Sequence, residues 1–271
     1  MDYLSIFLLI GLPSIFTIGL VINFLFALFD ELHIAIFHRP IYVHFYPKFS
    51  KISSEQEKIL LERFEFYAKL SDKRKKYFNH RMSLFLKKYD FIARENVVIT
   101  EEIQVTIAAT YVMLTFGMRH YLLKAFDKII IYPEEYYSTF SEQYHKGEFN
   151  PRMKAVVFSW KHFCEGYEVN NDNLNLGIHE FTHVVHHHSL ANQDGSSLNF
   201  MRQYNRVLKI INHPVSRQKL IDSEYFRCYA FTNNFEFVSV AIEHYFETPN
   251  QFKQEFPVLF KHVSRMLNHR H

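Results

Sequence analysis

The longest apolar run in the sequence lies at its N-terminus, where no charged residue occurs from Leu4 to Phe29. A helix over these residues would be roughly 39 Å long at about 1.5 Å per residue, enough to cross a hydrocarbon core of roughly 30 Å. We therefore expect residues 1–30 to form a transmembrane anchor. One alternative is a buried core helix. The other is a cleaved signal peptide, which is disfavoured by the acidic Asp2 and by the lack of a small-x-small cleavage site.

Positive charge is uneven around this run. No Lys or Arg precedes it, whereas Arg39, Lys48 and Lys51 follow it. Because Lys and Arg near a span are retained on the cytoplasmic side, this pattern favours a single-pass membrane protein whose remaining residues lie in the cytoplasm.

The pattern after the anchor predicts a connector and one compact domain. Residues 31–53 contain prolines and several serines, as is typical of a connector, and residues 54–271 hold enough Phe and Tyr to fill one core. The predicted helices cover about 54–70, 77–89 and 101–116, the predicted strands cover 128–132 and 155–160, and nearly all residues from 172 onward are predicted to be helical. The expected fold class is α+β, mainly helical.

One of the later helices carries a sequence with metal-binding chemistry. Asn171-Asp172-Asn173 predicts the start of this helix, and His179-Glu180-Phe181-Thr182-His183 follows inside it. Residues four apart share one helix face, so both imidazoles can reach one ion while Glu180 addresses a water molecule beside it. This HExxH spacing indicates zinc-assisted hydrolysis. The alternative is an ordinary helix whose histidines are solvated or satisfied in the core.

A second apolar helix, predicted to begin after Asn233 and to stop before Pro249, carries Glu236 and Glu243. A catalytic zinc ion takes three protein ligands, and a buried carboxylate without a partner is costly. Spacing alone allows either glutamate to be the third ligand, with the other orienting a zinc-binding histidine. The remaining alternative is that one or both carboxylates face water.

Several segments resemble a known family of peptidases. They are residues 105–110 (VTIAAT), 129–133 (IIIYP), 157–160 (VFSW), 178–183 (IHEFTH) and 235–249 (FEF through EHYFETP). These segments are similar to those of the Mlc titration factor A (MtfA-like) zinc peptidases, the M90 gluzincins, which in turn resemble the metalloprotease domain of anthrax lethal factor. The resemblance spans about residues 55 to 265 and implies a zincin-like metallopeptidase domain with a small sheet.

The resemblance also implies a set of metal ligands. In the matching positions of this chain, His179, His183 and Glu236 bind Zn²⁺, and Glu243 supports one of them from behind.

Two catalytic roles follow from the same resemblance. Glu180 acts as the general base that takes a proton from water and passes it to the leaving amine, and Tyr229, seven residues before Glu236, donates a hydrogen bond to the developing oxyanion. In zincins the substrate commonly lies along a strand edge, and residues 155–160 are the candidate strand. The alternative is that these residues form an ordinary core strand.

One position departs from the family pattern. His186 stands where relatives typically carry Asp, and His187 and His188 follow it. We expect His186 to support the site in a different way from that Asp. A solvated helix end favoured by the helix dipole and a second metal site are the other interpretations of the three histidines.

The remaining composition narrows the classes of function. Cys164 and Cys228 have no CxxC spacing, so no disulfide is expected and both are predicted to pack as small apolar residues. Residues 73–76 (KRKK) are the one dense basic run, predicted as a solvated helix approach or inter-helix loop, with anionic lipid contact as the second interpretation. No recognisable module supports nucleic-acid binding.

These observations predict a membrane-anchored, zinc-dependent metallopeptidase acting on peptide or protein substrates. A hypothesis from a different class is a non-catalytic regulatory protein that sequesters a partner such as a transcriptional repressor, since the family is named for binding one. The presence of Glu180 favours the enzyme, because sequestration does not need a general base.

Overall fold

The computed structural model describes residues 3, 7, 11–138, 142–168 and 172–269. Residues 4–6 and 8–10 of the predicted anchor and Asn171 of the predicted helix start lie outside this part. The helices are α2 (Leu12–Phe37), α3 (Ser54–Arg63), α4 (Glu65–Ala68), α5 (Asp72–Lys88), α6 (Glu101–Thr115), α7 (Trp160–Glu168), α8 (Leu176–Ala191), α9 (Gly195–Ile211), α10 (Pro214–Asp222), the 3₁₀ helix η2 (Cys228–Phe231), α11 (Asn234–Glu247), α12 (Pro249–Glu255) and α13 (Pro257–Met266). The strands are β1 (Asp90–Ala93), β2 (Lys128–Tyr132), β3 (Tyr136–Ser138), β4 (Gln143–His145), β5 (Gly147–Asn150) and β6 (Ala155–Ser159).

The fold is mainly helical with a small sheet, as predicted. Four strands lie in the order β1-β2-β6-β5, parallel except for β5, which pairs antiparallel with β6 and forms one edge. Strand β6 is buried throughout and paired on both sides. The expectation that residues 155–160 offer a free edge to a substrate is therefore wrong, and the free edge of this strand pair belongs to β5.

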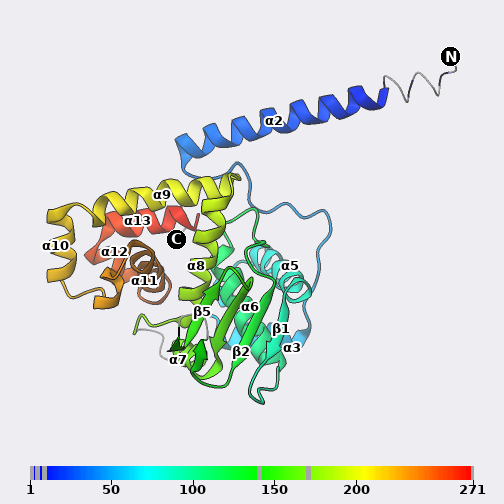
Figure 1. Ribbon diagram of the computed structural model, residues 1–271. Helices are drawn as coiled ribbons and strands as arrows, with labels where there is room; N and C mark the ends of the chain where they lie inside the picture. The colour runs from blue at the N-terminus through cyan, green and yellow to red at the C-terminus, as the bar shows by residue number, and fades with distance from the viewer. Residues whose placement is uncertain (1–2, 4–6, 8–10, 139–141, 169–171, 270–271) are drawn as a thin grey trace.

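Helix α6 forms the centre of the domain. Its residues from Ile103 to Thr115 are nearly all buried, because the segment is apolar on every side and packs against α3, α5 and α8. Helix α8 stands between the sheet and the group formed by α9, α11 and α13 (Figure 1). These neighbours therefore hold α8, the helix of the HExxH motif, from both sides.

Helix α5 begins earlier than predicted. It starts at Asp72 rather than near Tyr77, so Lys73 to Lys76 lie in its first turns and not in a loop before it. Asp72 in the first turn and Lys87 and Lys88 in the last complement the helix dipole, which favours this longer helix.

Helix α2 contains the long apolar run and continues beyond it. None of its most apolar 18-residue window is buried, and the helix is long and apolar enough to cross a membrane by length and composition. The last turns of α2, in contrast, pack on α9, and Asp30 and Ile34 are buried in this contact. The Asp30 carboxylate accepts two hydrogen bonds from Arg119, at 2.9 and 3.0 Å, and one from the Ile41 amide at 2.8 Å.

A glycine allows this close approach. A Cβ atom at Gly195 would lie 2.3 Å from Asp30 Oδ2 and 3.0 Å from Ile34 Cδ1. An exposed ion pair between Arg202 and Glu31, at 3.1 Å, lies on the same interface. We call this contact between the last turns of α2 and α9 the helix foot.

Cys164 and Cys228 are not joined in a disulfide, and only Cys164 is partly buried. Cys228 is exposed at the start of η2, so its predicted packing in the core is wrong.

Candidate metal centre

The HExxH helix begins at Leu176, later than the Asn171-Asp172-Asn173 sequence predicted. Asn175 is the N-cap, and its side chain accepts a hydrogen bond of 3.0 Å from the Ile178 amide. This start places His179 in the first turns of α8 and His183 one turn later, on the same face. Their Nε2 atoms face each other at 3.1 Å.

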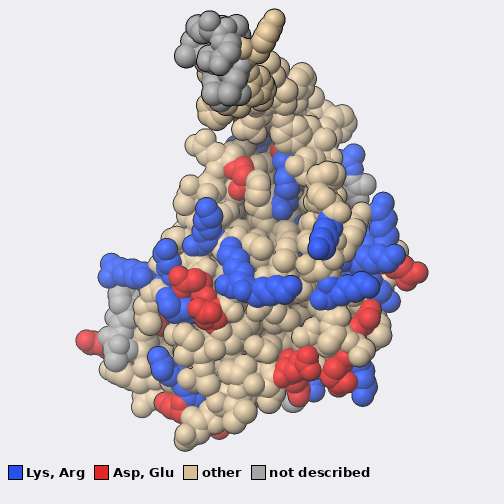
Figure 2. Space-filling view, turned by 90° about the vertical axis from the view of Figure 1, so that its right-hand side faces the viewer, with Lys and Arg blue, Asp and Glu red and all other residues tan. Residues whose placement is uncertain are grey.

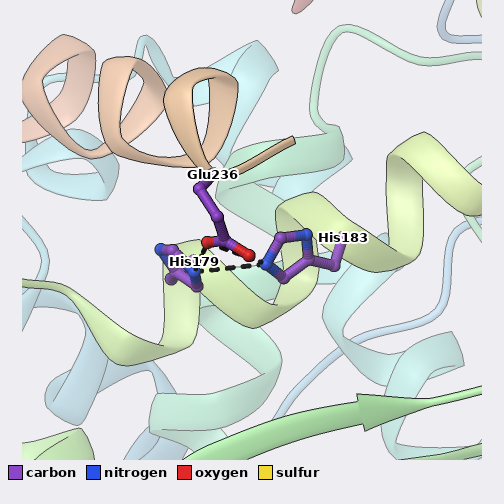
Figure 3. Close-up of side chains that lie close together, drawn as sticks. All are labelled: His179, His183 and Glu236. Atoms are coloured by element: carbon purple, nitrogen blue, oxygen red, sulfur yellow. Dashed lines mark hydrogen bonds and ion pairs between the residues drawn. The ribbon is translucent and has the colours of Figure 1, made fainter. Parts of the chain in front are cut away.

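Glu236 reaches these histidines from α11. The side chain of Asn233 caps this helix by accepting hydrogen bonds from the amides of Phe235 and Glu236, as its sequence predicted. Figure 3 shows the Glu236 carboxylate pointing at both imidazoles, with Oε2 at 2.9 Å from His179 Nε2 and 3.6 Å from His183 Nε2. The three ligand atoms lie within 4.8 Å of one another, so these residues could hold a metal ion.

Glu243 lies on the other side of His179. Its Oε1 atom is 2.8 Å from His179 Nδ1, and its side chain is 1 % exposed. A histidine that donates Nδ1–H to a carboxylate presents a lone pair at Nε2, which is the arrangement that binds a metal. Spacing could not distinguish the two glutamates, but their positions differ: Glu236 lies at the Nε2 atoms of both histidines and Glu243 at the Nδ1 atom of His179.

Arg227 completes this arrangement, although no sequence pattern pointed to it. Its guanidinium donates hydrogen bonds to both oxygens of Glu243, at 2.8 and 3.1 Å, and to the Asn173 carbonyl. The Asn175 amide donates another, of 2.9 Å, to Glu243 Oε2. The Glu243 charge is therefore compensated and its carboxylate is fixed in orientation.

His179 and its neighbouring carboxylates shift one another's pKa values. Burial lowers the pKa of His179, but the hydrogen bonds with Glu236 and Glu243 outweigh this and raise it to about 10. Burial raises the pKa of Glu236, yet hydrogen bonds with the two histidines hold it well below its usual range. Two imidazole nitrogens and a carboxylate oxygen converging in this way match the donor set of a catalytic zinc site.

Glu180 is buried beside the cluster and tied to the sheet edge. Its Oε2 atom accepts a hydrogen bond of 3.0 Å from the Phe149 amide of β5. Gly147 permits this approach, since a Cβ there would lie 3.1 Å from Glu180 Cγ and closer still to Leu176. Burial raises the pKa of the Glu180 carboxyl, and the charges of His179 and His183 partly oppose that rise.

Tyr229 lies near the cluster on η2. Its ring centroid is 5.9 Å from that of His179, and the Arg227 guanidinium is 5.8 Å from its ring. Burial and, to a smaller extent, the negative charge of Glu236 raise the pKa of the Tyr229 phenol, so the phenol remains a hydrogen-bond donor at neutral pH. The side chain is half exposed, at 49 %, and accessible to a bound molecule.

The three histidines after the motif point in different directions. His186 is buried between the rings of Tyr204 and Phe235, with both centroids at 4.5 Å, and burial lowers its pKa to about 4. His187 is exposed against Phe149, and His188 lies 3.8 Å from an Asp194 oxygen. Among the described residues, this run contributes no second group of metal ligands. The predicted supporting role of His186 stays a prediction. His186 would exert it by packing on Phe235, the residue next to Glu236.

Removing the Glu243 charge is expected to weaken metal binding. In Glu243→Gln the amide no longer accepts strongly from His179 Nδ1 and no longer neutralises Arg227, so the affinity for metal should fall about 10- to 100-fold. Competition with a chromophoric chelator measures this, with the exposed Glu255→Gln as the matched control. Equal affinities in the two variants would contradict the arrangement described.

A different carboxyl in α11 is expected to make stability pH-dependent. Burial and, to a smaller extent, the charges of Glu243 and Asp172 raise the pKa of Glu247 to about 8. Neither carboxylate oxygen of Glu247 is in contact with solvent. As pH rises from about 4.5 to 8, the unfolded chain releases this proton while the folded chain retains it, so stability falls.

The variant Glu247→Gln should remove this loss. We expect a gain on the order of 1 to 3 kcal/mol in the free energy of unfolding at pH 7.5 and almost none at pH 4.5. Thermal unfolding of the full chain in detergent at both pH values measures it, and an equal effect at the two values would show that the proton is not involved.

His179, His183 and Glu236, gathered beside the buried Glu180, have the residue types and spacing of a metallopeptidase-type site. The sequence model of the glucose-regulated metallo-peptidase M90 family matches residues 47–267, and the chain belongs to this family. This confirms the resemblance found in the sequence. An uncharacterized protein of Synechocystis sp., slr2042, is 25% identical over 227 residues, which cover 75% of this chain and 79% of that protein.

Proposed function

We propose that this protein is a membrane-anchored zinc metallopeptidase. The observation that carries the proposal is the convergence of His179, His183 and Glu236, with Glu180 held buried beside them. In this proposal the first three are the metal ligands. When bound, zinc would polarise a peptide carbonyl and lower the pKa of a water molecule to about 7.

The protein groups would carry out the proton transfers. Glu180 takes a proton from the attacking water and delivers it to the leaving amine nitrogen. Its raised pKa suits a group that must hold that proton between the two steps. Tyr229 donates a hydrogen bond from its phenol as the attacked carbonyl oxygen becomes negative.

A peptide substrate would lie along β5. This strand is the sheet edge beside α8, and its Phe149 amide already contacts Glu180. An extended peptide pairs with such an edge through main-chain hydrogen bonds, which give affinity with little regard to sequence. The general base and the peptide would then be positioned by the same strand.

The anchor is part of the same proposal. Helix α2 supports a single membrane span, and the lysines and arginine after it favour a cytoplasmic catalytic domain. The alternative function, sequestration of a regulatory partner without catalysis, gains no support from a buried and hydrogen-bonded Glu180.

Metal content and peptide cleavage of the full chain in detergent test the proposal together. We expect about one zinc per chain, loss of cleavage after treatment with a chelator, and recovery when zinc is restored. Zinc binding without cleavage of a broad peptide library would favour sequestration instead. A protein that takes up no metal would show that the ligand assignment is wrong.

A further inference from the structure

Helix α2 continues to Phe37, so the connector between α2 and α3 comprises residues 38–53 rather than 31–53. It presents an apolar surface to solvent. Ile41, Tyr42, Phe45 and Phe49 are 45 %, 41 %, 73 % and 45 % exposed, respectively. We call these four residues the connector surface. Exposed aromatic side chains grouped along a short segment mark an interaction site more often than an ordinary surface.

The backbone of this segment is fixed although its side chains are exposed. The Ile41 amide donates to Asp30 in the helix foot, and Tyr42 lies against Phe26 of α2, with ring centroids at 5.9 Å. At its other end, the Ser50 amide donates to His80 Nδ1 of α5 at 2.9 Å. The connector surface therefore has a defined position between α2 and α5.

Exposed lysines lie both in the connector and on α5. Lys48 and Lys51 are exposed in the connector, and Lys73 and Lys76 are exposed on α5. The ring of Phe49 stacks on Tyr77 of α5 and lies against His80. Lys73 precedes Tyr77 by one helical turn and Lys76 precedes His80 by one turn, so both lysines share the helix face that the connector covers.

This region faces the same way as the N-terminal end of α2. Figure 2 views the molecule from the side toward which that end points, and Lys and Arg form a band across this face beneath the helix, with smaller groups of Asp and Glu beside and below it. A bilayer crossed by α2 would lie on this side of the domain.

We propose that the connector surface and these four lysines form a docking site for an anionic bilayer. The aromatic side chains enter the interfacial layer, where such side chains are enriched, and the lysines lie against anionic headgroups. This inference rests on the membrane anchoring proposed above, but not on peptidase activity. It assigns to the domain a direct contact with lipid, in addition to its attachment through α2.

The full chain in lipid nanodiscs allows a direct test. In Phe45→Trp, brominated lipids should quench the new fluorescence by about half or more if the side chain enters the interface. Val258→Trp is the matched control, since Val258 is 58 % exposed on α13, away from the connector. The unmodified chain, with Trp160 as its single tryptophan, supplies the background.

Removing positive charge from the connector provides a second test in the same nanodisc assay. Lys48→Gln with Lys51→Gln should weaken docking on anionic nanodiscs about 25-fold, since each lysine near such a surface contributes about fivefold. Lys219→Gln with Lys253→Gln, two exposed lysines on α10 and α12, should leave docking unchanged.

Incorporation into nanodiscs separates the possible failures. If the chain incorporates but the Phe45→Trp variant is quenched no more than the Val258→Trp variant, the docking site is wrong while the anchor stands. If the chain does not incorporate, both the anchor and the docking site are wrong. Peptidase activity can be present or absent in either case without changing this result.

Discussion

Glu180→Gln is expected to lower kcat for peptide cleavage by about 10²- to 10⁴-fold while leaving metal content unchanged. The amide has nearly the shape of the carboxylate but cannot accept a proton from water. It also keeps an oxygen that can accept the hydrogen bond from the Phe149 amide, so the β5 edge should stay in place. Steady-state kinetics and metal analysis of the same preparation measure the two effects.

Glu165→Gln is the control for this substitution, because Glu165 is an exposed glutamate on α7. It should retain full activity. A Glu180→Gln protein that cleaves at the unmodified rate would show that another group acts as the base, and one that loses its metal would show that Glu180 is needed to assemble the site.

His183→Ala is expected to abolish both metal binding and activity. Loss of a residue that only supports a metal ligand lowers metal affinity by up to about 100-fold. Removing one of the three proposed ligands should therefore lower the affinity by more than about 100-fold. Isothermal titration with zinc measures the affinity, and cleavage should disappear at the zinc concentrations that saturate the unmodified protein.

His187→Ala is the control on the same helix. His187 is the next histidine on an exposed position of α8, and its replacement should preserve metal binding. Equal loss of affinity in the two variants would indicate damage to the helix, while retained affinity in His183→Ala would exclude His183 as a ligand.

Local pattern was sufficient to predict the two helices of the site. The capping residue Asn233 and the apolar period that follows it define α11, and the HExxH spacing places His179 and His183 on one face of α8. These properties depend on residues close in sequence. The sequence alone predicts too early a start for α8, because Asn173 and Asn175 are both good capping residues and only packing decides between them.

Contacts distant in sequence could not be predicted in the same way. Glu236 and Glu243 share a helix face, so their roles depend on where α8 crosses that face. Arg227 is one of 31 Lys and Arg residues and becomes distinctive only through its contact with Glu243. Strand β5 has no clear signal in the sequence, because it is only four residues long, three of them are partly exposed, and polar and apolar residues do not alternate clearly.

The helix foot has a consequence for the choice of substrate. Asp30 and Ile34 are buried against the domain, and Arg119 holds the Asp30 carboxylate through two hydrogen bonds, so α2 is joined to the domain by a fixed contact rather than by a loose tether. If α2 crosses a bilayer, the active site stands at a set height above the lipid. The proposed peptidase would then select by distance: it would reach peptide bonds presented at that height, while bonds held much nearer to or farther from the membrane would escape it whatever their sequence.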